Sequence, residues 1–102
     1  MLRVVERMFG EGQLWHEGIH VLDAGYQMSL YREWRDEAGT LTPGGFVIDG
    51  HVMAPPEALS SLLFTTTPLT LRLEDGRQAQ IYIVSEDGSI ASADDRGVEE
   101  RA

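Results

Sequence analysis

Apolar and polar residues alternate along most of the chain, and glycine-containing turns separate the alternating runs. The clearest run extends over residues 25–35, where Tyr26, Met28 and Leu30 alternate with polar neighbours. Because successive side chains of a β-strand point to opposite faces, a period of two predicts a strand with one apolar face. The pattern is therefore typical of an antiparallel, strand-rich protein.

The chain after this first long strand predicts a hairpin with an irregular connection. Residues 39–45 consist mostly of threonine, proline and glycine, which favour turns, so we expect a long hairpin loop there. Residues 46–52 then predict the return strand, on which Phe46, Ile48 and Val52 share a face. Gly50 interrupts this strand and predicts a bulge or a point of close backbone approach.

Shorter strands and one helix follow in the second half. Pro55-Pro56-Glu57 is a typical helix start, and leucines follow it at helical spacing, so residues 55–64 predict a short helix. Two Asp-Gly pairs, at residues 75–76 and 87–88, predict tight turns between the strands expected at residues 69–73, at 78–85 and around Ile90.

These elements predict a mainly β fold, a small antiparallel barrel or sandwich of about six to seven strands with one short helix near residues 55–64. Residues 1–93 are expected to form a single domain, and residues 94–102 an acidic, disordered tail because they lack apolar periodicity. The pattern of the first nine residues fits both a strand and a short helix.

Composition excludes several classes of function. The 102 residues contain no cysteine, which excludes disulfides, thiolate metal ligands and a cysteine nucleophile. A net charge of −9 would repel phosphate backbones, so we expect no nucleic-acid partner. No apolar run approaches the roughly 20 residues of a membrane span, and charges interrupt the amino terminus. We therefore expect a cytoplasmic protein without membrane contact.

One motif carries a specific chemical hypothesis. His16-Glu17-Gly18-Ile19-His20 resembles the H-E-x-x-H pattern of zinc metalloproteases, in which two histidines hold the metal and the glutamate acts as base. The resemblance covers these five residues and implies His16 and His20 as metal ligands and Glu17 as the catalytic group. It requires a helix over residues 11–24.

The glycines in and around this motif favour a hairpin instead. Gly12, Gly18 and Gly25 would each cost about 1 kcal/mol relative to alanine in a helix. In the hairpin interpretation, residues 16–18 form a three-residue loop, and Trp15, Ile19 and Val21 share one face of the two flanking strands. This interpretation predicts no metal site and no catalytic residue at the motif.

Other candidate residues have structural interpretations that we favour. His51 and Asp49 share a strand face but lack an evident nucleophile, and the serines at 60 and 61 belong to the polar face of the helix. No glycine-rich phosphate-binding loop is present. The aromatic residues could line a ligand pocket, but alternating strand positions favour core packing. These residues are Trp15, Tyr26, Tyr31, Trp34, Phe46 and Tyr82.

The sequence thus leads to one favoured function and two alternatives. We expect a non-catalytic β domain without a cofactor, which mediates protein–protein interaction or self-association through a sheet edge or an exposed aromatic face. The first alternative is a minimal zinc-dependent hydrolase that uses His16, Glu17 and His20. The second is a carrier of a small apolar ligand, which would need an internal cavity.

Overall fold

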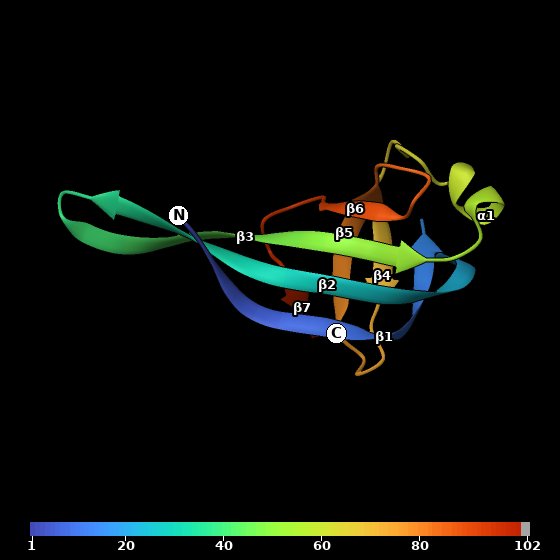
Figure 1. Cartoon of the computed structure of the whole chain (residues 1–102), viewed down its shortest axis with the longest axis horizontal. Helices are drawn as coiled ribbons and strands as arrows, with labels where there is room; N and C mark the ends of the chain where they lie inside the picture. Colours follow the sequence, from blue (N-terminus) through green and yellow to red (C-terminus); the bar gives the residue numbers. More distant parts are fainter. Residues whose placement is uncertain (101–102) are drawn as a thin grey trace.

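The computed structural model describes residues 1–100 and shows a mainly β protein with one short helix (Figure 1). The predicted fold class is confirmed, because a seven-stranded antiparallel sheet forms the protein. Its elements are β1 (Leu2–His16), β2 (Ile19–Glu37), β3 (Thr40–Met53), α1 (Pro56–Ser60), β4 (Leu69–Arg72), β5 (Gln78–Ile83), β6 (Ser89–Ser92) and β7 (Val98–Glu99).

Six of the strands close into a ring. The sheet order is β4-β1-β2-β3-β6-β5-β7, and an additional pairing of β4 with β5 closes the first six strands. The pairing of β1 with β4 is short, from Gln13 to His16, whereas β1 and β2 pair along nearly their whole length. Most of the length of β1 therefore has a neighbouring strand on one side only.

The apolar face of each strand fills the interior of the ring. Tyr26, Met28 and Leu30 of β2 are buried there, as the period of two predicts. The hairpin of β4 and β5 contributes several fully buried side chains, and no polar or charged residue among residues 1–100 is buried. The core also contains Met8, Leu14, Ala24, Ile48, Val52, Leu59, Leu62, Leu69, Leu71, Leu73, Ala79, Ile81, Ile83 and Ile90.

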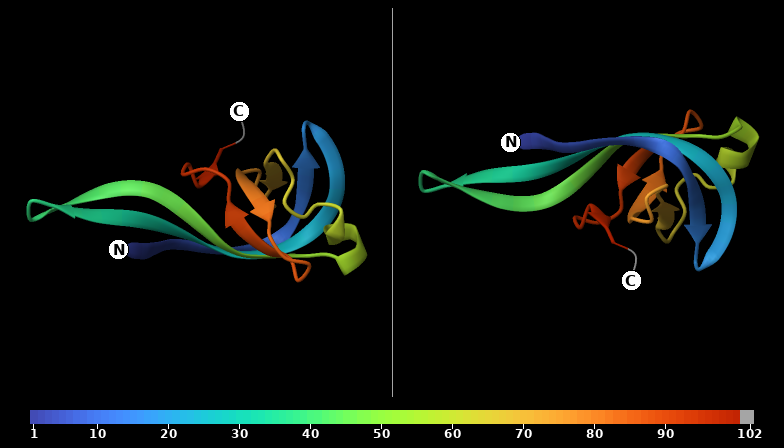
Figure 2. Two further views of the ribbon diagram at one scale, coloured as in Figure 1. Left: turned by 90° about the horizontal axis from the view of Figure 1, so that it is seen from above. Right: turned by 90° about the horizontal axis from the view of Figure 1, so that it is seen from below.

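β1, β2 and β3 continue beyond the ring as an extension that is three-stranded near the ring and, at its tip, consists of β2 and β3 alone (Figure 2). We call residues 1–6, 31–37 and 40–47 the arm. The long loop predicted at residues 39–45 is wrong, because Ala38 and Gly39 alone form the turn, with φ angles of 53° and 82°, and Thr40 already begins β3. Proline and glycine are tolerated here because β3 is an edge strand in the arm.

The remaining elements refine the sequence predictions. The first nine residues belong to a strand, which resolves the two alternatives. The helix is shorter than predicted, from Pro56 to Ser60, and lies at the end of the ring away from the arm (Figure 1). No helix among residues 1–100 has the length and apolar character needed to cross a membrane.

The carboxyl-terminal residues contact the sheet as far as they are described. Val98 and Glu99 form β7, which pairs with Ala79 and Gln78 of β5. The N–H of Phe46 donates a hydrogen bond to the carbonyl of Asp95 at 2.8 Å. Residues 94–100 therefore pack on the ring, in contrast to the predicted disordered tail, and residues 101–102 of that prediction lie outside the described part.

Candidate functional site: the free edge of β1

The zinc-protease motif forms a β-hairpin. β1 ends at His16 and β2 begins at Ile19, and Glu17 and Gly18 form the turn with φ angles of 52° and 80°. The hairpin prediction is confirmed, although the loop has two residues and not three. The helix that the hydrolase hypothesis requires is not present, so that hypothesis loses its structural basis.

The two histidines of the motif lie on opposite faces of this hairpin. Trp15 pairs with His20 and His16 pairs with Ile19, and directly paired residues share a face whereas successive residues alternate. His16 and His20 therefore cannot hold one ion. Trp15 and Ile19 also face opposite sides, so the predicted common face of Trp15, Ile19 and Val21 is wrong; the two-residue turn pairs Trp15 with His20, whereas a three-residue loop would pair it with Ile19.

Each histidine of the motif has a local polar partner. His16 Nε2 lies 2.8 Å from the hydroxyl of Thr67, which donates to Glu17 Oε1 at 3.1 Å. His20 Nε2 lies 2.9 Å from Asp23 Oδ1. These contacts hold the turn against the segment before β4. In the described residues, no group of three or more histidine, aspartate or glutamate side chains is arranged to bind a metal.

His51 has a serine neighbour that the sequence analysis did not identify. His51 pairs with Ser89 across β3 and β6, and its Nε2 lies 3.3 Å from Ser89 Oγ. The Ser89 hydroxyl donates to Asp87 Oδ1 at 2.7 Å, and this hydrogen bond lowers the pKa of Asp87. The serine thus lies between histidine and carboxylate, whereas a relay needs the histidine in the middle. Asp49 pairs with Ala91 instead.

The aromatic residues divide between core and surface. Tyr26 is buried, and its hydroxyl accepts a hydrogen bond from the N–H of Glu74 at 3.1 Å. Phe46 packs against the core and lies under Arg32, and Trp15 lies under Arg72. The other three, Tyr31, Trp34 and Tyr82, are half-buried. Buried side chains fill the ring, and the apolar groove lined by Leu2, Tyr31 and Val47 is open to solvent.

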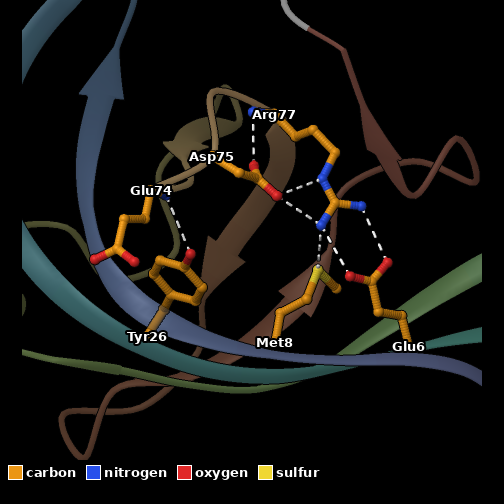
Figure 3. A network of polar contacts seen from close by, with 6 residues as sticks. All are labelled: Glu6, Met8, Tyr26, Glu74, Asp75 and Arg77. Carbon is orange, nitrogen blue, oxygen red and sulfur yellow. Dashed lines mark hydrogen bonds and ion pairs between the residues drawn. The ribbon is translucent and has the colours of Figure 1, made fainter.

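A network of polar contacts ties β1 to the β4–β5 hairpin (Figure 3). Arg77 binds both carboxylate oxygens of Glu6, at 3.0 and 2.9 Å, and also binds Asp75 at 2.8 Å. The hydrogen bonds from Arg77 lower the pKa of Glu6 and of Asp75. The two carboxylates, Glu6 foremost, raise the pKa of the Arg77 guanidinium. This network fixes the inner face of β1 but leaves its backbone edge uncovered.

The Arg77 network predicts a pH-dependent contribution to stability. Carboxyls whose pKa is lower in the folded state stabilise the protein above their ordinary range near pH 4–5, and the contribution disappears as the pH falls through the lowered pKa. We expect Arg77→Met to lower the melting temperature at pH 7 and to converge with the wild type at about pH 2–3. Thermal melts across this range measure the difference.

Arg96→Met is the matched control, because within residues 1–100 Arg96 pairs with neighbours in its own segment, Asp94 and Glu99. Exposed pairs of this kind contribute little, so its effect at pH 7 should be smaller. A difference between Arg77→Met and wild type that stays constant down to pH 2–3 would show that the charge pairs do not cause it.

The backbone direction of β1 follows from two sets of hydrogen bonds. Met1 and Trp34 exchange two backbone hydrogen bonds, at 3.0 and 2.8 Å, so the polar groups of Met1 face β2. In an antiparallel strand the N–H and C=O of one residue point to the same side, and successive residues alternate. The polar backbone groups of Leu2 and Val4 therefore point away from β2.

At the other end of the edge, the N–H of Glu11 donates to the Glu74 side chain at 3.4 Å, away from β2. By the same alternation, the polar groups of Arg7 and Phe9 also point away. The outward residues have even numbers up to Val4 and odd numbers from Arg7 onward. This change results from Val5, an extra residue at a register shift between Val4 and Glu6. We call residues 2–9, with these outward groups, the free edge, because β4 pairs with β1 only from Gln13 onward.

The opposite edge of the arm, on β3, is already protected. The N–H of Phe46 donates to Asp95, and the N–H of Ile48 donates to Ser92 Oγ. Further out, Pro43 has no N–H and occupies the strand itself. Within residues 1–100, β1 therefore carries the longer stretch of outward backbone groups without a strand partner.

Apolar side chains accompany the free edge. Phe9 is 81% exposed, Val5 54%, Leu2 52% and Val4 46%. Leu2, Val4 and Phe9 lie on the outer face of the sheet, because their partners on β2 alternate with the buried residues Leu30 and Met28. Such a combination of unpaired backbone and exposed apolar residues is typical of a strand that pairs with another chain.

Comparison with known proteins adds no relative. No protein-family model, no curated protein and no solved structure matches the chain.

Proposed function

We propose that this protein is a non-catalytic binding domain that joins another polypeptide by strand addition to the free edge of β1. The observation that carries the proposal is the row of outward backbone groups at residues 2–9 without a neighbouring strand. An added strand would satisfy these groups with main-chain hydrogen bonds, and its side chains would contact the exposed residues Leu2, Val4 and Phe9.

The polar contacts elsewhere in the chain support a binding role over a catalytic one. His16 contacts Thr67 in the segment before β4, His20 contacts Asp23 of its own strand, and His51 contacts Ser89 of the neighbouring strand. These contacts account for the positions of the three histidines structurally. The outward backbone groups of the free edge, by contrast, have no partner strand within residues 1–100. Long exposed edges usually carry proline or lysine, which oppose pairing, and residues 2–9 contain neither.

A proline substitution tests the proposal. Val4→Pro removes an outward N–H and places a ring on the free edge, whereas the hydrogen bonds between β1 and β2 remain because Val4 does not face β2. We expect Val4→Pro to weaken binding of strand-forming peptides by at least about tenfold, which corresponds to about 1.4 kcal/mol. Selection of peptides from a random library on the immobilised full chain, followed by titration against both proteins, measures this change.

Leu41→Pro is the matched control, because Leu41 is exposed on the β3 edge, beside Pro43, where we expect no strand to add. It should bind the selected peptides like the wild type. Thermal melts establish that both variants are folded. Peptides that bind Val4→Pro and wild type equally, or a selection that enriches no extended peptide, would contradict strand addition at β1.

A further inference from the structure

We infer that the strand added to β1 is β1 of a second copy of this chain, in an antiparallel pair about a two-fold axis. The inference rests on the proposed function and names its partner. In this arrangement Leu2 faces Phe9 of the second copy, and Val4 faces Arg7 of the second copy. One continuous sheet would then extend through both molecules.

The spacing of the outward backbone groups carries this inference. The outward residues are Leu2, Val4, Arg7 and Phe9, because the extra residue Val5 separates the two pairs. This set is symmetric about a point between residues 5 and 6. A two-fold axis at that point therefore matches all four outward residues with outward residues of the second copy, as antiparallel hydrogen bonding requires.

The same spacing lets an unrelated regular strand, such as a selected peptide, pair with only one half of the free edge. A regular strand presents polar groups at every second residue, so it matches Leu2 and Val4 or Arg7 and Phe9, but not both pairs. Bulges on edges commonly prevent pairing for this reason. A second β1 has the same bulge, and the two-fold axis places the two bulges opposite each other.

The side chains are complementary in this register. Leu2 and Phe9 share the outer face, so each copy covers the most exposed apolar side chain of the other. On the inner face, Arg3 lies opposite Met8 of the second copy and diagonally beside its Glu6. Arg3 has no ion pair within residues 1–100, whereas Arg77, Arg35 and Arg96 do. The diagonal contact would supply Arg3 with a carboxylate.

The local net charge and the position of β4 also permit pairing of the two β1 strands. Among residues 1–12, two arginines balance two glutamates, so this segment carries no net side-chain charge although the whole chain carries −9. Met1 of the second copy would lie opposite Gly10, ahead of Gln13, where the pairing with β4 begins. Because the remaining charges of the two copies repel each other, we expect added salt to strengthen the association.

A pair of charge substitutions tests the register. Leu2→Glu places a carboxylate opposite Phe9, and Phe9→Arg places a guanidinium opposite Leu2, so each variant alone should self-associate at least about tenfold more weakly than wild type. In an equimolar mixture, Glu at position 2 of one chain faces Arg at position 9 of the other, and the second Leu2–Phe9 contact is native. We expect the mixture to form heterodimers.

Sedimentation velocity and native mass spectrometry of the full chain measure these states, and the wild-type dimer should have twice the 11.3 kDa mass of one chain. Ile19→Glu and Phe64→Arg are matched controls, because both replace apolar side chains that are 69% exposed and lie outside the free edge. Both should dimerise like the wild type.

The outcomes separate this inference from the proposed function. A wild type that stays monomeric up to concentrations on the order of 100 μM overturns the inference; if Val4→Pro still abolishes peptide binding, strand addition at β1 survives. A dimer that tolerates Leu2→Glu and Phe9→Arg, or variants that do not combine as heterodimers, also overturns the register. If each variant alone self-associates weakly and the two form heterodimers when mixed, the result supports the register.

Discussion

Replacing Gly88 with alanine should destabilise the protein by about 2–5 kcal/mol, because it combines backbone strain with a steric overlap. Gly88 has a φ of 90°, which L side chains rarely adopt, and a Cβ there would overlap with the carbonyl oxygen of Val52. That close approach allows the Gly88 carbonyl to accept the N–H of Val52 at 2.9 Å, next to the pairing of β3 with β6.

Gly76→Ala is the matched control for this prediction. Gly76 has a similar φ of 93°, but a Cβ there would meet no atom within 4 Å, so alanine should cost only the left-handed strain of about 1–2 kcal/mol. Chemical denaturation of both variants at one protein concentration measures the difference. Equal losses would show that the loop before β6 moves away from Val52 without cost.

Replacing Ile81 with alanine should cost about 2–5 kcal/mol, because it removes a fully buried side chain where the ring closes. Ile81 lies opposite Leu69 of β4 and Ser92 of β6, so strands on both sides hold its backbone in place. The neighbouring strands therefore cannot easily move inward to fill the cavity that the substitution leaves. The expected fall in melting temperature is about 8–40 °C, at about 4–8 °C per kcal/mol for a domain of this size.

Gln80→Ala, on the other face of the same strand, is the control for Ile81→Ala. It removes one hydrogen bond, from Thr70 at 3.0 Å, and should cost about 0.5–1.5 kcal/mol. Calorimetric melts at matched protein concentration compare the two variants. A loss for Ile81→Ala no larger than that for Gln80→Ala would contradict the assignment of this side chain to the closed core.

The sequence predicted the position and face of most ring strands. Where alternation is strict, as at Leu69, Leu71 and Ile81, the predicted buried residues are those of the core, because a shift by one residue would expose the whole apolar set. The turn between β4 and β5 was also predictable from Asp75 and Gly76, since glycine supplies the positive φ.

Sequence predictions failed where pairing with a neighbouring strand overrides the backbone conformation that the local residues favour. Pro43 and two glycines favour a loop, yet they lie in β3 because β2 pairs with it through Thr40. Val98 and Glu99 lack apolar periodicity, yet β5 pairs with them. In both cases hydrogen bonds to another strand determine the conformation, and no local pattern encodes them.

The candidate site also has a part that the sequence predicts and a part that depends on the tertiary structure. The sequence by itself determined that a glycine-rich motif with His16 and His20 would favour a hairpin, because turn geometry depends on local residues. It also showed the alternation that places Tyr26, Met28 and Leu30 in the core. Only the tertiary structure decided which edges remain open, since β4 covers β1 from Gln13 onward and leaves residues 2–9 free. An edge is defined by the absence of a neighbour, and neighbours distant in sequence meet only when the ring closes.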